Sequence, residues 1–130
     1  NYIDEWNKAR RDHAKTYNEL FAGCSDIQTP HELDNTYCVY HQYTVKIPNR
    51  DNIHKMLQEA GIGAMLYYPV PLHLQKVHDH LGWTKGMLPN TEKDTECVIS
   101  LPMFPELTLE EQKTVASTLI ECIEKSKALA

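Results

Sequence analysis

Apolar residues recur with two different spacings along this chain, and the spacings divide it into helices and strands. Near the start, one side is formed at intervals of three, four and seven positions by Ile3, Trp6, His13, Tyr17 and Leu20. This is the spacing of an amphipathic helix. Gly23 follows the pattern and is a typical helix stop, so we expect a helix that ends near Ala22.

Between residues 37 and 47 the spacing changes to two. Tyr37, Val39, Tyr43, Val45 and Ile47 alternate with more polar residues. Alternation of this kind predicts a long strand with one apolar face. His41 falls on the same face, where a histidine either makes hydrogen bonds within the core or belongs to a site. The pattern alone leaves both interpretations open.

Residues at segment ends predict further helices. Asn49 can cap a helix that ends before Gly61. Pro71 suits the first turn of another helix, and one or two helical turns are expected over residues 91–96. Residues 108–111, Thr-Leu-Glu-Glu, form a capping box that predicts the start of the last helix. In the helix that begins at Pro71, the expected inward positions are Leu74, Val77 and Leu81.

Short apolar runs over residues 63–68 and 97–101 are typical of buried strands. Together with residues 37–47 they give three strands with helices between and around them. The expected order is helix, strand, helix, strand, helix, short helix, strand, helix. This order predicts a small two-layer α/β sandwich.

Composition narrows the possible functions. A chain of 130 residues with 42% hydrophobic and 24% charged residues is typical of one globular domain. The net charge of −5 gives no basic field, so we expect no nucleic-acid partner. No apolar run approaches the roughly 18 to 20 residues that span a bilayer, and we expect no membrane partner.

The four cysteines, Cys24, Cys38, Cys97 and Cys122, are widely spaced, and none belongs to a C-x-x-C pair. We therefore expect reduced, buried thiols in a cytoplasmic protein rather than disulfides. The first residues are polar and resemble no signal peptide. There is no initiator Met, and a helical pattern is already present at Ile3, which suggests a piece of a longer chain.

The most unusual stretch is residues 66–75, LYYPVPLHLQ. Pro69 and Pro71 fix the backbone and end a strand, so the turn should be rigid. It presents the hydroxyl groups of Tyr67 and Tyr68 and the imidazole of His73. Such a turn can bind a polar ligand, or it can be ordinary turn chemistry.

Other kinds of site find little support. The glycines are scattered and form no phosphate-binding loop. His73, His78 and His80 suggest zinc, but His73 and His78 are five positions apart, and no cysteine or carboxylate completes a known pattern. We expect surface histidines and no metal. A nucleophilic Cys–His pair is left open, although no cysteine stands in a telling context.

Several stretches together resemble the C-terminal part of the DegT/DnrJ/EryC1/StrS sugar aminotransferases, in collinear order and over nearly the whole chain. They are residues 6–20 (WNKARRDHAKTYNEL), residues 40–43 (YHQY) followed by Arg50-Asp51, residues 66–75, and residues 99–107 (ISLPMFPEL). The resemblance implies the small C-terminal domain of fold-type I aminotransferases, with a three-stranded, largely antiparallel sheet. Residues 24–130 would form this domain, and residues 1–23 would be a truncated helix that connects it to a missing large domain.

The resemblance also implies an activity. Enzymes of this family use pyridoxal phosphate (PLP) to transfer an amino group, usually from glutamate, to a keto sugar carried on a nucleoside diphosphate. They usually work as homodimers with sites near the subunit interface. The implied partners are therefore a nucleotide-sugar substrate, an amino donor and a second copy of the enzyme.

The same resemblance implies that part of the machinery lies elsewhere. The Schiff-base lysine, the ring-stacking residue and the phosphate-binding loop belong to the large N-terminal domain. None of the ten lysines here resembles that lysine, so we expect the isolated chain to be inactive. The alternative is a non-catalytic module of the same fold that serves in dimerisation or regulation.

Tyr67 and Tyr68 occupy the two positions before Pro69 that face the sugar nucleotide in this family. Many members have His-Tyr at these positions. A phenol in place of the imidazole stays neutral near pH 7. We therefore expect Tyr67 to donate a hydrogen bond rather than to shuttle a proton.

Three further residues are substrate-binding candidates by resemblance. His41 and His73, like Gln75, match recurrent motif positions, where bracing of the turn by hydrogen bonds is an equally good interpretation. Arg50 can be a phosphate ligand, or it can be a solvated residue at the start of a helix.

Overall fold

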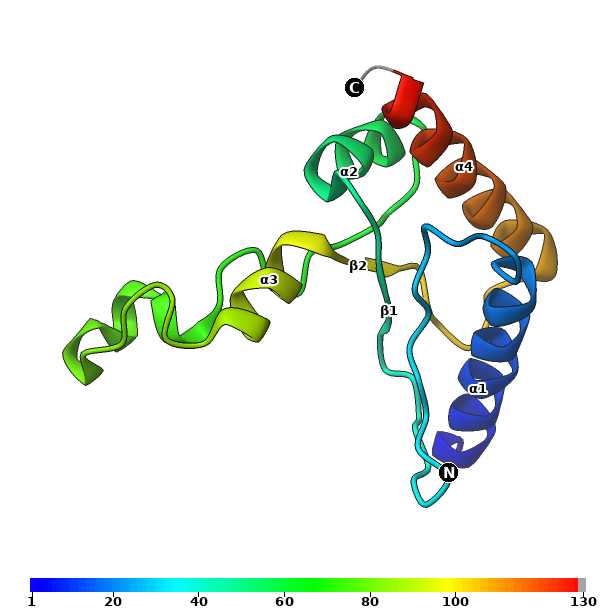
Figure 1. Ribbon diagram of the computed structural model, residues 1–130. Helices are drawn as coiled ribbons and strands as arrows, with labels where there is room; N and C mark the ends of the chain where they lie inside the picture. Colours follow the sequence, from blue (N-terminus) through cyan, green and yellow to red (C-terminus); the bar gives the residue numbers. More distant parts are fainter. Residues whose placement is uncertain (129–130) are drawn as a thin grey trace.

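A computed structural model describes residues 1–128. Its helices and short strands form an α/β arrangement (Figure 1). In order they are α1 (Ile3–Leu20), β1 (Tyr43–Lys46), α2 (Arg50–Glu59), the 3-10 helices η1 (Leu72–Leu74) and η2 (Lys76–Leu81), α3 (Pro89–Cys97), β2 (Val98–Leu101) and α4 (Leu109–Ala128).

The sheet has two antiparallel strands. β1 pairs with β2 in a register that joins Tyr43 to Leu101 and Lys46 to Val98. A single bridge lies on each side, Gln28 with Lys46 and Met65 with Ser100. The prediction of an α/β fold with a small antiparallel sheet is confirmed.

The expected third strand over residues 63–68 is wrong as an extended strand. Only Met65 pairs with β2, through hydrogen bonds of 2.9 and 2.8 Å to Ser100. After Met65 the chain turns away from the sheet, so its next residues have no strand to pair with.

The long strand expected over residues 37–47 is also wrong in length, because β1 covers only Tyr43–Lys46. Its first part is held by side chains of α1 instead of a neighbouring strand: Arg10 donates to the carbonyl of Val39, and Arg11 to that of Cys38. Tyr40 then adopts a left-handed conformation with φ of 48°, which ends any extended run. His41 is therefore exposed and does not face the core, contrary to the alternating pattern.

The core lies between the sheet and the three long helices. Tyr17 of α1 stacks on Tyr43 of β1 with ring centroids 4.9 Å apart, and both side chains are fully buried. α4 packs against α1 near its start and against α2 near its end (Figure 1). Gln112 donates to the carbonyl of His13 at 2.9 Å. The α4 helix thus holds the other two helices together.

Helix ends follow the sequence signals in part. The capping box of α4 is confirmed: Thr108 N–H donates to Glu111 at 2.8 Å, and Glu111 N–H donates to Thr108 Oγ1 at 3.3 Å. Asn49 does not cap α2 with its side chain. Its backbone is left-handed, with φ of 46°, and its side-chain amide donates to Ser126 Oγ. The stop at Gly61 is confirmed by its left-handed φ of 78°.

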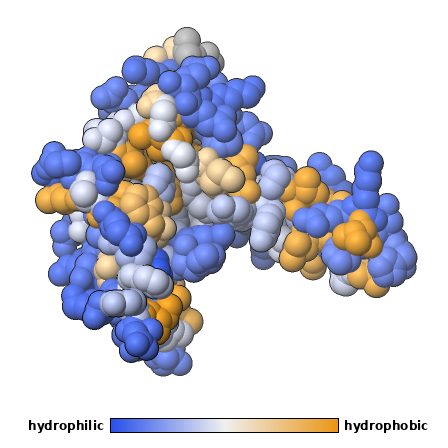
Figure 2. All heavy atoms as spheres, turned by 180° about the vertical axis from the view of Figure 1, so that it is seen from behind, coloured by the Kyte–Doolittle hydropathy of each residue, from blue (hydrophilic) through white to orange (hydrophobic). Residues whose placement is uncertain are grey.

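Residues 67–97, here called the arm, extend away from the rest of the molecule, here called the body (Figure 1). The helix expected to begin at Pro71 is wrong, because this stretch forms η1 and η2 instead. Val77 and Leu81, expected to face inward, are 70% and 56% exposed. No layer lies beside the arm to cover them, and Figure 2 shows apolar side chains on its surface.

All four cysteines are free, and only Cys122 is buried. Cys38 is exposed, so the expectation of buried thiols is wrong for this residue. Within the described part of the chain, no helix combines the length and apolar character needed to cross a bilayer.

Candidate functional site

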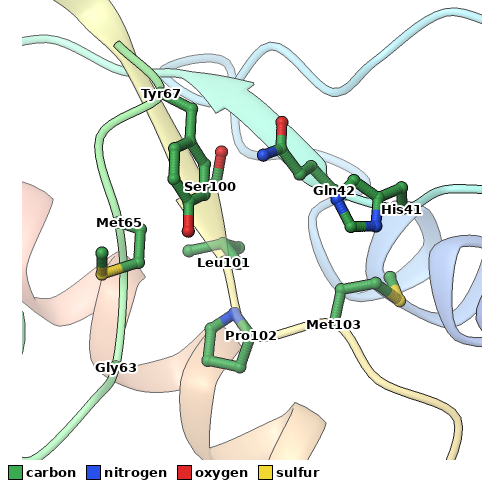
Figure 3. Close-up of a pocket in the computed structure, with 9 residues that line it drawn as sticks. All are labelled: His41, Gln42, Gly63, Met65, Tyr67, Ser100, Leu101, Pro102 and Met103. Atoms are coloured by element: carbon green, nitrogen blue, oxygen red, sulfur yellow. The ribbon is translucent and has the colours of Figure 1, made fainter. Parts of the chain in front are cut away.

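A pocket opens where the arm leaves the body. It has a volume of about 190 Å³ and lies over the edge of the sheet (Figure 3). We call it the Tyr67 pocket. Its lining comes from three segments of the chain: His41 and Gln42 before β1, Gly63, Met65 and Tyr67 before the arm, and Ser100, Leu101, Pro102 and Met103 at the end of β2.

The local backbone explains how His41 reaches this pocket. Tyr40 is buried and packs its ring against Tyr43 at 6.3 Å. Its left-handed φ turns the chain just before β1, so that His41 and Gln42 lie on the wall opposite Tyr67 (Figure 3). A non-glycine residue in this conformation is strained and is common at functional sites.

Tyr67 and Tyr68 are exposed at the site. Their rings meet edge to face at 5.8 Å, and the peptide bond between them is cis. They are 38% and 57% exposed, and neither hydroxyl has a hydrogen-bond partner among the described residues. Both hydroxyls are thus free to bind a polar ligand.

Tyr67 also borders a second hollow of about 290 Å³ between the two limbs of the arm. We call it the arm groove. One wall is formed by the limb that leaves the body and the other by α3. The lining residues are Tyr67, Tyr68, Val70, Pro71, Leu72, Thr91, Asp94, Thr95 and Val98.

His73 is not part of either hollow. Its side chain is only 6% exposed, and its Nε2 lies 3.1 Å from Glu92 Oε1. The ring of Trp83 meets it edge-on at 6.4 Å, while Nδ1 is buried without a partner in the described structure. Of the two interpretations left open by the sequence, this geometry favours bracing of the arm.

Gln75 also braces the turn, because its amide donates to the carbonyl of Val70 at 3.4 Å. Arg50 lies outside both hollows. It is 5% exposed, and its guanidinium donates to the Val98 carbonyl at 2.9 Å and to Asp51 at 2.7 Å. It is therefore not the solvated residue that the sequence allowed, and its hydrogen bonds are made within the domain.

Several site residues escaped sequence reasoning. Gln42, Met65 and Ser100 line the Tyr67 pocket, and Glu92 holds His73. Ser100 lies within an apolar run that predicted a buried strand and gave no sign of a site. Its hydroxyl lies 2.8 Å from that of Thr44 across the sheet. Glu92 carried no signal beyond its place after Pro89 at the start of a short helix.

The lining of the Tyr67 pocket does not by itself fit PLP. That cofactor needs a lysine for its Schiff base and donors for its phosphate, and neither lysine nor arginine lines the Tyr67 pocket. Among residues 1–128, no group of three His, Cys, Asp or Glu side chains could hold a metal ion.

Comparison with known proteins identifies relatives of about three times the length. A "pleiotropic regulatory protein" of Geobacillus stearothermophilus is 45% identical, with 92% of this chain and 33% of that protein covered. A UDP-N-acetyl-3-dehydro-α-D-glucosamine 3-aminotransferase of Acidithiobacillus ferrooxidans is 36% identical, with 91% and 31% covered. The chain thus spans about a third of these relatives.

Solved structures match this chain over a similar share of their length. DesV of S. venezuelae is 32% identical with a TM-score of 0.89, with 95% of this chain and 33% of that one covered. Spr1654 of Streptococcus pneumoniae, also solved in a PLP form, is 26% identical in its apo form, with a TM-score of 0.90 and 98% and 33% covered. The sequence profile of one family matches residues 1–120. The chain belongs to the DegT/DnrJ/EryC1/StrS aminotransferase family.

Proposed function

We propose that this chain is the substrate-side, C-terminal part of a PLP-dependent aminotransferase that acts on a nucleotide-linked keto sugar. One observation carries the proposal: a family member presents the free hydroxyls of two adjacent tyrosines at open hollows, Tyr67 at the Tyr67 pocket and both Tyr67 and Tyr68 at the arm groove. Relatives named as transaminases of UDP- and dTDP-linked sugars support the substrate class. The amino donor in this proposal is glutamate.

In this proposal, the chain binds and orients the substrate. Tyr67 and Tyr68 donate hydrogen bonds to oxygens of the sugar nucleotide, and His41 contacts it from the opposite wall of the Tyr67 pocket. PLP, when bound, supplies the electron sink for the amino transfer. Residues outside this chain hold it, and residues 1–23 lead from that larger domain into residues 24–130.

We also propose a homodimer, in which the apolar surface of the arm is covered. Val77, Leu81 and Trp83 are exposed in this chain alone, and large exposed apolar side chains close together mark interaction sites.

The test uses the full-length protein and single variants of the two tyrosines. Tyr67→Phe removes only a hydroxyl, and we expect the KM for the nucleotide keto sugar to rise about tenfold, the equivalent of one lost hydrogen bond. Tyr68→Phe should act in the same direction. The KM for glutamate should not change, since the amino donor reacts in a separate half-reaction.

Tyr2→Phe is the matched control, because Tyr2 is exposed and lies outside both hollows. If Tyr67→Phe and Tyr68→Phe both leave the sugar KM within twofold of the parent, the two hydroxyls do not bind substrate. The isolated chain should remain inactive with added PLP. An absorption band of a lysine Schiff base in that mixture would contradict this part of the proposal.

A second function, a non-catalytic regulatory or dimerisation module, is favoured by the names of two relatives. One is the "pleiotropic regulatory protein", and another is the "Erythromycin biosynthesis sensory transduction protein EryC1" of Saccharopolyspora erythraea. Turnover decides between the two functions. A full-length protein that forms no amino sugar from glutamate and a panel of UDP- and dTDP-linked keto sugars would favour the regulatory module.

A further inference from the structure

The arm has no hydrophobic core of its own. None of residues 67–97 is buried in the described structure. Its 3-10 helices and turns are held by hydrogen bonds between near neighbours along the chain. Local hydrogen bonds that face water contribute little to the stability of one particular shape. Another interaction must therefore set how the two limbs of the arm lie relative to each other.

Glu92 on α3 provides that interaction. Its carboxylate accepts the N–H of Gly86 with both oxygens, at 2.8 and 2.9 Å, and the N–H of Leu88 at 3.3 Å. His73 Nε2 lies 3.1 Å from the same carboxylate. We call this cluster the Glu92 clasp. The glutamate side chain is 12% exposed and the histidine side chain 6%.

The contact between His73 and Glu92 joins residues that are far apart in the sequence. It spans 19 positions and joins the limb that leaves the body to the limb that returns. The other hydrogen bonds within the arm join residues six or fewer positions apart. The clasp is therefore the one polar tie between the limbs in the described residues.

The returning limb is itself fixed to the body. Lys46 of β1 forms an ion pair of 2.6 Å with Asp94, two positions after Glu92 on α3. A continuous series of contacts thus runs from the sheet through α3 to His73. Between His73 and Tyr68 stand Pro69 and Pro71, whose rings fix the backbone. The position of His73 is thereby transmitted to the two tyrosines.

The charge of the clasp suits this role. Burial raises the pKa of Glu92, but hydrogen bonds from Gly86, His73 and Leu88 lower it more, so that the pKa lies below its usual range. The residue is ionised at neutral pH. An ionised carboxylate that accepts several N–H groups makes stronger hydrogen bonds than a neutral group.

We propose that Glu92 and His73 are positioning residues that set the width of the arm groove and hold Tyr67 and Tyr68 toward the sugar nucleotide. Neither residue touches the substrate. This inference rests on the proposed function, because it assigns the tyrosines to the substrate. It adds two residues to the site that act through others, and it gives His73 a role different from direct binding.

The test compares three variants of the full-length protein. Glu92→Gln keeps the size of the side chain but turns an NH₂ group toward an N–H donor. His73→Phe keeps a ring against Trp83 and loses the donor. His73→Gln keeps a donor close to the position of Nε2 and serves as the conservative variant. Glu111→Gln is the control, since this carboxylate also accepts an N–H but caps α4 in the body.

Two readouts are measured. Amide exchange at Gly86 and Leu88 should become at least about tenfold faster in Glu92→Gln, because the neutral carboxamide offers one acceptor oxygen in place of two and its NH₂ group faces N–H donors. The KM for the nucleotide keto sugar should rise about tenfold in Glu92→Gln and His73→Phe, while the glutamate half-reaction keeps its rate. His73→Gln should restore most of the affinity, and Glu111→Gln should change neither readout.

The outcomes separate this inference from the function on which it rests. Unchanged amide exchange in Glu92→Gln shows that the clasp does not form and overturns the inference. Faster exchange with an unchanged sugar KM, while Tyr67→Phe still raises that KM, overturns the inference and leaves the proposed function intact. If Glu92→Gln impairs the reactions with the sugar and with glutamate equally, the clasp has a purely structural role and the inference is overturned. If Tyr67→Phe has no effect either, both proposals fall. Should Glu92→Gln not fold, the two His73 variants give the same comparison.

Discussion

Arg50 is almost enclosed, and its guanidinium donates to the carbonyl of Val98 at the start of β2. Asp51 balances its charge from the surface. Loss of the guanidinium leaves a carbonyl with reduced access to water and without its partner, which costs about 1–3 kcal/mol.

We therefore expect Arg50→Met to lower the free energy of unfolding by that amount and to leave the sugar KM unchanged. Urea unfolding and steady-state kinetics of the same preparation provide the measurement. Arg10→Met is the matched control, because the Val39 carbonyl that Arg10 binds belongs to an exposed residue. A raised KM at unchanged stability would return Arg50 to the list of substrate ligands.

Gly86 adopts a φ of 92°, a conformation that costs side-chain-bearing residues about 1 kcal/mol. A Cβ added there meets no atom within 4 Å, so Gly86→Ala tests the backbone conformation alone. We expect faster amide exchange in the arm and unchanged exchange in the body. Gly63→Ala is the control, since its Cβ is equally free and its φ is not left-handed. Equal exchange in the two variants would contradict this prediction.

How well a candidate site residue could be predicted from the sequence depended on whether a motif marks it or backbone groups hold it. Tyr67 and His41 were identified from motifs, and the structure places both at one pocket. Glu92 could not be found in this way, because two of its partners are backbone N–H groups that leave no trace in the sequence. The environment of His73 depends on the same residue. A site assembled from backbone donors is visible only after the chain has folded.

At the scale of elements, the start of α4 depends on its capping box. Thr108 and Glu111 satisfy each other's N–H groups at the helix end. Thr108→Ala removes this cap and should destabilise the fold by about 1 kcal/mol. Thr114→Ala is the control, because Thr114 is exposed within the same helix and alanine is favoured there. A thermal unfolding series tests both, and an equal loss of stability would contradict the assigned cap.

The stability that this cap gives to α4 also depends on pH. Hydrogen bonds from the backbone and hydroxyl of Thr108 lower the pKa of Glu111 below its usual value near 4.5. Because the pKa of Glu111 is lower in the folded than in the unfolded chain, the stabilisation is fully present above the usual value near 4.5. It is lost as the pH falls through the folded-state pKa. We expect the stability difference between the parent and Glu111→Gln to shrink in that range. A constant difference down to pH 2 would contradict this.

Elements were predictable where a local signal and the tertiary surroundings agree. α1 and α4 have both a clear period and a buried face, and the sequence indicates them correctly. Residues 37–41 have a strand period, yet Arg10 and Arg11 occupy their carbonyl groups. Residues 71–81 have a helical period, but no layer packs against them. Sequence periodicity does not reveal which partner an apolar face finds.

At the scale of the whole molecule, a pair of buried tyrosines joins α1 to the sheet. Burial raises the pKa of Tyr17 and Tyr43 well above the usual range of a phenol. In the unfolded chain both titrate near pH 10. Since the folded-state pKa values are the higher ones, the stabilisation is complete below that pH and is lost as the pH rises above it.

We therefore expect the free energy of unfolding to be nearly flat from pH 7 to 9 and to fall above about pH 10. Urea titrations at each pH measure it. Replacement of both residues by phenylalanine lowers stability at neutral pH, because Tyr17 donates to the Pro102 carbonyl and Tyr43 to Asn18. The same replacement should make the alkaline fall shallower. An equally steep fall would show that other groups cause it.

The bridge between Met65 and Ser100 has a consequence for how this scaffold can diversify. The chain departs after Met65 and comes back beside it at β2, where the two residues exchange hydrogen bonds. The excursion is thus a closed insert whose ends already meet, and none of residues 67–97 within it belongs to the core. Inserts of different length and sequence can be exchanged at this point while β1 and β2 keep their pairing. Grafting the corresponding segment from a relative onto an unchanged domain therefore tests whether the arm sets the choice of substrate, as the proposed function requires.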